Sequence, residues 1–125
     1  MKANQLYTRQ QANDGVTTPI LFPDGTPTGQ TVTILSTDSD VFRKAARESN
    51  RNRIKVNELP ESEQDEAHHA NAITLVASLV TEWSLEDECS PENVRELLAN
   101  SPTFKDLVNE VATDRSNFFS KPSKS

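Results

Sequence analysis

Apolar and polar positions follow two different periods along this chain, and the change of period separates an N-terminal β segment from a helical remainder. In residues 31–35, Val32 and Ile34 alternate with threonines, which is the two-residue period of a half-buried strand. A second candidate strand covers residues 17–22, and a loop rich in proline and glycine joins the two segments. The pattern predicts two antiparallel strands, with Pro19 confining the first to a sheet edge.

Four helices are predicted after this β segment. The first begins at a cluster of capping side chains in residues 36–39 and ends at about residues 50–52. The longest covers residues 62–83, where the apolar side chains span an arc of about 200°, against roughly 100° for a helix that packs on one core. Two shorter helices begin at residues 90–91 and 101–102, each a Ser-Pro pair in which serine caps and proline takes the first helical position.

These elements predict a mostly α fold: a four-helix domain with a small N-terminal antiparallel β element. The chain is predicted to be a single domain over residues 1–125. Residues 1–15 are too polar to offset the entropy of ordering them, so they are predicted to form a mobile N-terminal arm. Residues 16–119 are the predicted folded core, and residues 120–125 are predicted to be a flexible tail.

Composition limits the classes of function that the chain can have. Thirteen basic and nineteen acidic residues give a net charge of −6, so binding to phosphate backbones is not expected to be its main work. Only 34% of the residues are hydrophobic, which predicts a thin core. The single cysteine, Cys89, excludes an internal disulfide and a thiolate metal cage. No apolar run approaches 18 residues, and we expect a soluble intracellular protein that does not enter membranes.

No residue pattern indicates catalysis, a metal or a cofactor, and we expect a protein without enzymatic activity. His68 and His69 are adjacent, so on a helix they point about 100° apart and cannot share one metal ion; a solvated helix surface is the simpler interpretation. Acidic residues precede Cys89 and would raise the pKa of its thiol. Gly25 and Gly29 lie in a proline-bearing loop without lysine, unlike a phosphate-binding loop.

Six of the thirteen basic residues gather within positions 43–55, directly before an acidic stretch at 58–66. One interpretation is an electrostatic docking surface for an acidic partner or RNA. Its central residues are Arg43, Arg47, Arg51 and Arg53. The other interpretation, which we favour, is a solvated helix and loop whose charges pair with the acidic stretch. The first interpretation leaves open a second class of function, a small nucleic-acid-binding regulator that uses the basic segment 43–55.

The apolar side chains divide into a set assigned to the core and a set with two candidate roles. The set at regular helical spacing is assigned to the core: Ile73, Val76, Val80, Phe104, Leu107 and Val111. Five others extend the apolar arc past what three short helices cover, and they are candidates either for a partner-binding surface or for the core: Leu75, Leu79, Trp83, Phe118 and Phe119. A flat apolar surface of this kind would equally support self-association.

Residues 26–119 resemble the tail assembly chaperones of long, non-contractile-tailed bacteriophages of the lambdoid type. The resemblance lies in an order of features rather than in a catalytic motif. That order is a strand-and-turn segment at 27–34, Asp-Ser-Asp-Val-Phe at 38–42, a helix that ends in Val-Thr-Glu-Trp-Ser-Leu at 80–85, the segments 90–98 and 102–108, and a closing Ala-Thr-Asp-Arg-Ser-Asn-Phe-Phe at 112–119.

The resemblance implies a mostly helical protein without catalytic residues. Members of this family bind the tape measure protein before the tail tube assembles around it, keep it soluble and help to recruit tail tube subunits. They act in the host cell cytoplasm and are absent from the mature virion, so they are non-structural. With these protein partners, the five candidate surface residues are expected to form a groove for a helix of the tape measure protein. Nucleic acid and membranes are not expected partners.

Many members of the family also make a second, longer product by ribosomal frameshifting near the end of the shorter gene. In this chain, Asn117-Phe118-Phe119 can be encoded by AAU-UUU-UUC, which contains a run of the slippery type. The resemblance therefore implies a second, longer product, and the codons used for residues 117–119 in the gene test this expectation.

Overall fold

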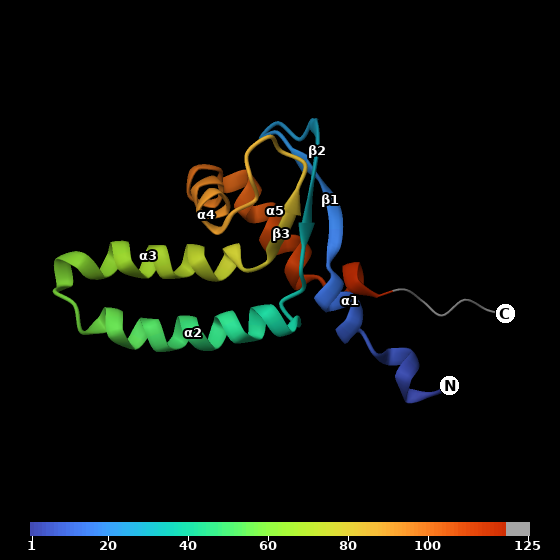
Figure 1. Cartoon of the computed structure of the whole chain (residues 1–125), viewed down its shortest axis with the longest axis horizontal. Helices are drawn as coiled ribbons and strands as arrows, with labels where there is room; N and C mark the ends of the chain where they lie inside the picture. Colours follow the sequence, from blue (N-terminus) through green and yellow to red (C-terminus); the bar gives the residue numbers. More distant parts are fainter. Residues whose placement is uncertain (120–125) are drawn as a thin grey trace.

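The computed structural model describes residues 1–119, which form a small antiparallel sheet, two C-terminal helices of which the second packs on the sheet, and a long helical hairpin that extends away (Figure 1). The strands are β1 (Val16–Leu21), β2 (Pro27–Ile34) and β3 (Val80–Trp83), in the spatial order β1-β2-β3. The helices are α1 (Arg9–Asp14), α2 (Asp40–Asn57), α3 (Glu61–Ala77), α4 (Pro91–Asn100) and α5 (Pro102–Thr113), with 3-10 turns η1 (Ala3–Leu6) and η2 (Arg115–Phe118). The predicted flexible tail, residues 120–125, lies outside the described residues.

The predicted fold class, a mostly α four-helix domain with a small N-terminal β element, is wrong. Residues 1–119 contain five α-helices, and the sheet takes its third strand from the middle of the chain. The helix predicted over 62–83 ends at Ala77, and β3 then pairs with β2, for example through Ile34 opposite Val80. Valine, threonine and tryptophan suit a pleated surface better than a helix. Pairing with β2 buries Val80 and partly buries Trp83, while Thr81 and Glu82 stay exposed.

The two predicted N-terminal strands and both Ser-Pro helix starts are confirmed. β1 and β2 are antiparallel neighbours, and Pro19 lies in the edge strand β1. The Oγ of Ser90 accepts the N–H of Asn93 at 3.2 Å, and the Oγ of Ser101 accepts the N–H of Phe104 at 3.2 Å. Each serine therefore satisfies a backbone donor that the first helical turn leaves unpaired.

The core lies between the sheet and the helices α4 and α5. Its buried side chains are Ile20, Val32, Ile34, Leu35, Ile73, Leu79, Val80, Val94, Leu98, Phe104, Val108 and Ala112. Of the residues predicted for the core, Ile73, Val80 and Phe104 are buried, while Val76, Leu107 and Val111 are partly buried against them. The cluster fixes the end of β3 relative to α4, and these two elements border the site described below.

Helices α2 and α3 lie side by side as an antiparallel hairpin (Figure 1). α2 continues to Asn57, beyond its predicted end, because its asparagines bond to α3. Asn52 Nδ2 donates to Asn71 Oδ1 at 3.1 Å, and Asn57 Oδ1 lies 3.0 Å from His68 Nε2. Val56 is the one buried residue of α2. Hydrogen bonds therefore contribute much of the contact between these two helices.

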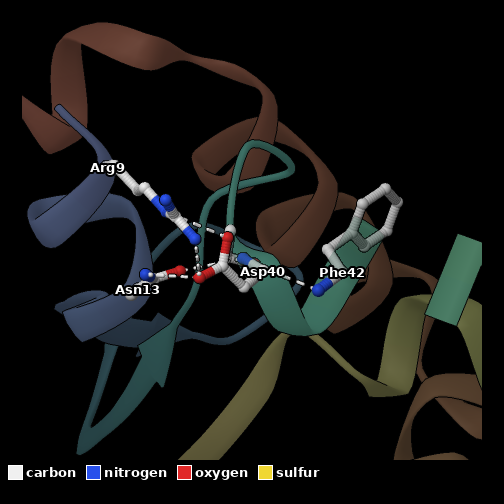
Figure 2. A network of polar contacts seen from close by, with 5 residues as sticks. Arg9, Asn13, Asp40 and Phe42 are labelled. Atoms are coloured by element: carbon white, nitrogen blue, oxygen red, sulfur yellow. Dashed lines mark hydrogen bonds and ion pairs between the residues drawn. The ribbon is translucent and has the colours of Figure 1, made fainter. Parts of the chain in front are cut away.

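The N-terminal segment, predicted to be a mobile arm over residues 1–15, contains helix α1, which lies at the base of the hairpin (Figure 2). The Arg9 guanidinium donates to the Asp40 carboxylate at 2.9 and 3.2 Å. Asn13 accepts the backbone N–H of Asp40 at 2.8 Å and donates to its carboxylate at 3.1 Å. Ala12 is 1% exposed. These contacts are mostly between polar side chains, so the hydrophobic pattern of the sequence does not reveal them.

A second carboxylate at the start of α2 holds the C-terminal part of the described chain. Asp38 accepts two hydrogen bonds from the Arg115 guanidinium at 2.7 and 3.2 Å, and the Thr37 N–H donates to the Ala112 carbonyl at 3.0 Å. The arginine hydrogen bonds hold the pKa of Asp38 and of Asp40 below the ordinary aspartate value. Residues 37–40 thus join α1, α2 and the end of α5, which orients the hairpin.

Candidate protein-binding groove

A groove opens between the end of β3, the loop that follows it and helix α4. Its volume is about 430 Å³, and its lining residues are Trp83, Leu85, Asp87, Asn93, Glu96, Leu97 and Asn100. We call it the acidic groove. The last four residues stand three, one and three positions apart, so one face of α4 forms a wall of the groove. The apolar part of the lining (Trp83, Leu85 and Leu97) is half-buried, and it remains partly accessible to a partner.

Trp83 is fixed in position by contacts at both its polar and its apolar parts. Its indole N–H donates to the backbone carbonyl of Asp87 at 2.7 Å. Its ring meets the ring of Phe104 edge to face, with the centroids 6.5 Å apart and an angle of 68° between the planes. Because Phe104 is buried, this contact packs the Trp83 ring against the core.

The loop between β3 and α4 is also held by hydrogen bonds at both ends. Ser84 Oγ accepts the backbone N–H of Thr31 at 2.8 Å and lies 2.8 Å from Gln30 Oε1, which ties the loop to β2. At the other end, Asn93 Nδ2 donates to the backbone carbonyl of Glu88 at 2.8 Å. These bonds form the acidic groove before any partner binds, which lowers the entropy cost of binding.

Negative charge concentrates in the segment that supplies most of the groove lining, and two of its carboxylates, Asp87 and Glu96, line the groove. Residues 82–96 contain six carboxylates and one arginine, a net charge of −5 in a chain whose total is −6. The two ion pairs within residues 1–119, Arg9 with Asp40 and Arg115 with Asp38, use none of these carboxylates. The rim of the groove is therefore available to cations that a partner brings.

The structure separates the five residues predicted to form one partner-binding surface, so that prediction is wrong as a whole. Leu79 and Phe118 are 1% and 2% exposed, which makes them part of the interior. Leu75 is half-buried in a hollow between α2 and α3. Phe119 is 41% exposed and does not line the acidic groove. Of the five, Trp83 alone lines the groove.

Sequence reasoning missed the remaining lining residues of the groove, Leu85, Asp87, Asn93, Glu96, Leu97 and Asn100. Leu97 is half-buried and lines the groove. The mixed polar and apolar positions 93, 96, 97 and 100 share one face of α4, and that spacing was the available signal.

The predicted docking arginines lie on helix α2, and all of them are exposed. At about 100° per residue, five basic side chains fall within roughly 120° of one another, opposite the side of α2 that contacts α3. We call them the basic stripe: Arg43, Lys44, Arg47, Arg51 and Lys55. Arg53 falls outside this arc. The structure thus places three of the four predicted docking arginines on one solvated face.

The favoured interpretation of this segment is a solvated helix whose charges pair with the acidic stretch. The helix is solvated, but the predicted pairing with the acidic stretch is wrong. No basic residue of α2 takes part in the ion pairs of residues 1–119. The acidic stretch enters α3 from Glu61 onward, and the hairpin joins the two helices through amide side chains such as Asn52 and Asn71. The basic stripe faces away from that contact, which leaves it in solvent.

The histidine pair and the cysteine have structural surroundings. His68 lies 3.0 Å from the Asn57 side chain within the hairpin, while His69 is exposed. Cys89 is half-buried; its burial, and after it the charge of Glu82, raise the pKa of the thiol. Within residues 1–119 no group of three or more His, Cys, Asp or Glu side chains is arranged to hold a metal ion.

Comparison of the chain with known protein families, with characterised proteins and with solved structures finds no match. Among the described residues, no helix has the length and apolar character needed to cross a bilayer. The functional inference therefore depends on the chemistry of the acidic groove and of the basic stripe.

Proposed function

We propose that this protein is a tail assembly chaperone of a long, non-contractile-tailed phage, which binds the tape measure protein, keeps it soluble and helps to recruit tail tube subunits. The observation that carries the proposal is the preformed acidic groove with its half-buried apolar floor, formed by Trp83, Leu85 and Leu97. The segments whose order resembles this chaperone family include most of the groove lining, because Trp83 and Leu85 lie in segment 80–85 and most of α4 in segment 90–98.

The groove suits a temporary partner. A tape measure protein is expected to be long and helical with exposed apolar stripes, and such stripes aggregate unless they are covered. An amphipathic helix can place apolar anchors against Trp83, Leu85 and Leu97, in the helix-in-groove mode of recognition. A groove of this volume covers only a short part of such a helix, and small interfaces belong to transient complexes. Transience fits a chaperone that leaves before the tail is complete.

Co-expression with the tape measure protein tests the proposal. We expect the wild-type chain to keep the tape measure protein in the soluble fraction and to co-purify with it. Leu97→Lys, which places a charge on the apolar floor, should abolish both effects. Leu21→Lys is the matched control, since Leu21 is 39% exposed on β1 and lies outside the groove. This control should behave as wild type.

Two results would contradict this function. If the wild-type chain neither solubilises nor co-purifies with the tape measure protein, the chain is not its chaperone. If Leu97→Lys binds as well as Leu21→Lys, the partner uses another surface. Far-UV circular dichroism of both variants shows whether each has kept its fold, and Glu96→Lys provides a groove variant at an exposed position where folding is least affected.

A second candidate function, a small nucleic-acid-binding regulator, draws on the solvated basic stripe. Five cations along about 18 Å of helix supply the positive charge that contacts with phosphates need. The regulator predicts salt-dependent binding of duplex DNA or single-stranded RNA that Arg47→Glu with Arg51→Glu removes. The chaperone predicts that this double variant keeps its protein partner. Fluorescence anisotropy with labelled oligonucleotides at low and physiological salt separates the two functions.

A further inference from the structure

We infer that the acidic groove selects a cationic amphipathic helix: a segment of the partner whose apolar side chains enter the groove and whose lysines or arginines meet its rim. This inference rests on the proposed function and gives the chemistry of the partner segment. It follows from three properties of the groove, namely its hydrogen-bonding groups, its charge and its apolar floor.

The polar groups that line the groove are mainly acceptors. Asp87 and Glu96 contribute carboxylates. The amide nitrogens of Asn93 and Asn100 already donate, at 2.8 Å each, to the backbone carbonyls of Glu88 and Glu96. Within residues 1–119 the side-chain oxygens of these two asparagines accept no hydrogen bond, and the Trp83 N–H is already used. A partner must therefore supply donors, and lysine and arginine supply them together with positive charge.

The negative charge of the groove also favours a partner helix with basic residues. A partner helix that covers the groove removes water from the two carboxylates that line it, Asp87 and Glu96. Desolvated carboxylates without a counter-charge are unfavourable, and acidic flanks on the partner would add repulsion. Basic flanks offset both effects and accelerate association through long-range attraction.

The apolar floor sets the form of the partner segment. Trp83, Leu85 and Leu97 leave room for apolar anchors, and the wall formed by α4 offers positions 93 to 100, about 10 Å of helix. Two anchors one turn apart on a partner helix, about 5.4 Å, fit within that length. Trp83 also offers an aromatic ring to a neighbouring lysine or arginine. An amphipathic helix with basic flanks combines these features, whereas nucleic acid would be repelled by the rim.

Two synthetic helical peptides test the inference with the full chain. Both carry the same leucine stripe and neither contains tryptophan; one has lysine at its polar positions and the other glutamate. Trp83 is the single tryptophan of the protein, so its fluorescence reports events in the groove directly. We expect the lysine peptide to bind, with an affinity that falls as salt rises, and the glutamate peptide to bind at least roughly tenfold more weakly.

Charge-reversal variants locate the effect. Glu96→Lys should weaken the lysine peptide at least roughly tenfold and strengthen the glutamate peptide. Glu110→Lys is the matched control, since Glu110 is an exposed glutamate on α5 that does not line the groove, and it changes the net charge equally. This control should shift both affinities only slightly.

Several results would overturn the inference. Equal affinity for the two peptides, or equal weakening of the lysine peptide by Glu96→Lys and Glu110→Lys, would show that the groove does not select charge. A wild-type chain that dimerises in sedimentation experiments, and that Glu96→Lys and Arg47→Glu each make monomeric, would show that α2 of a second copy is the occupant.

The two proposals fail separately. If the chain keeps the tape measure protein soluble but does not distinguish the peptides, the proposed function stands and the charge selection is wrong. If the chain prefers the lysine peptide but does not bind the tape measure protein, the selection stands and the proposed function is wrong.

Discussion

Substitution of Leu79 by alanine tests whether this residue belongs to the core or to a partner-binding surface. Leu79 is 1% exposed, belongs to the main core and directly precedes β3, and its backbone carbonyl accepts the Leu35 N–H at 2.8 Å. Leucine-to-alanine changes at enclosed sites cost about 2–5 kcal/mol, through lost transfer free energy and the cavity that remains. A domain of this size has about 5–15 kcal/mol in total, so the loss is a large fraction of its stability.

Urea unfolding followed by far-UV circular dichroism and Trp83 fluorescence measures this loss. We expect Leu79→Ala to lower the free energy of unfolding by at least about 2 kcal/mol. Leu59→Ala is the control, because Leu59 is 40% exposed in the turn between α2 and α3, and it should cost less than about 1 kcal/mol. A cost for Leu79→Ala as small as that of the control would refute the placement of Leu79 in the interior and return it to the surface.

Three further predictions concern Gly15 before β1, the carboxylates Asp38 and Asp40, and Ser84 in the loop between β3 and α4. Gly15 has φ +78° and a Cβ there would lie 2.8 Å from the Ile34 carbonyl oxygen, so Gly15→Ala should cost about 1–3 kcal/mol in urea unfolding; a neutral result would contradict this backbone conformation. The arginine hydrogen bonds lower the pKa of Asp38 and of Asp40, so their contribution to stability is complete above the ordinary aspartate pKa and is lost as the pH falls through the lowered values. Urea midpoints between pH 7 and pH 2 should therefore fall less steeply for the double Asn variant, and an unchanged slope would contradict the pairing. Ser84→Ala should weaken the lysine peptide while the unfolding midpoint changes little, and equal peptide affinity would show that this serine does not order the loop.

The elements that the sequence predicts well are set by local chemistry. The caps Ser90 and Ser101 need only the backbone N–H three residues ahead. The strand β1, which contains Pro19, pairs with β2, the next strand along the chain. β3 depends on its pairing with β2, which lies about fifty residues earlier, and the β-propensity of four residues is too weak a local signal to predict that pairing. Helical periodicity favoured a longer helix there, and tertiary pairing overrode it.

The candidate site was predictable only in part for the same reason. Periodicity shows that Leu79 and Trp83 are apolar positions, but it does not show which of them the fold encloses. The groove forms because the loop after β3 is tied to β2 and folds toward α4, which brings Leu85 near Leu97. The basic segment was visible in the sequence, whereas the side of α2 on which it lies followed from the contact of Asn52 with Asn71.

Hydrogen–deuterium exchange of the chain with and without the tape measure protein tests the central claim most directly. The account predicts that complex formation slows exchange across residues 84–100, the loop and helix that form the acidic groove, and leaves the hairpin of α2 and α3 unchanged. Protection confined to the hairpin, or no protection at residues 84–100 in a complex that has formed, would contradict the assignment of the groove as the partner-binding site.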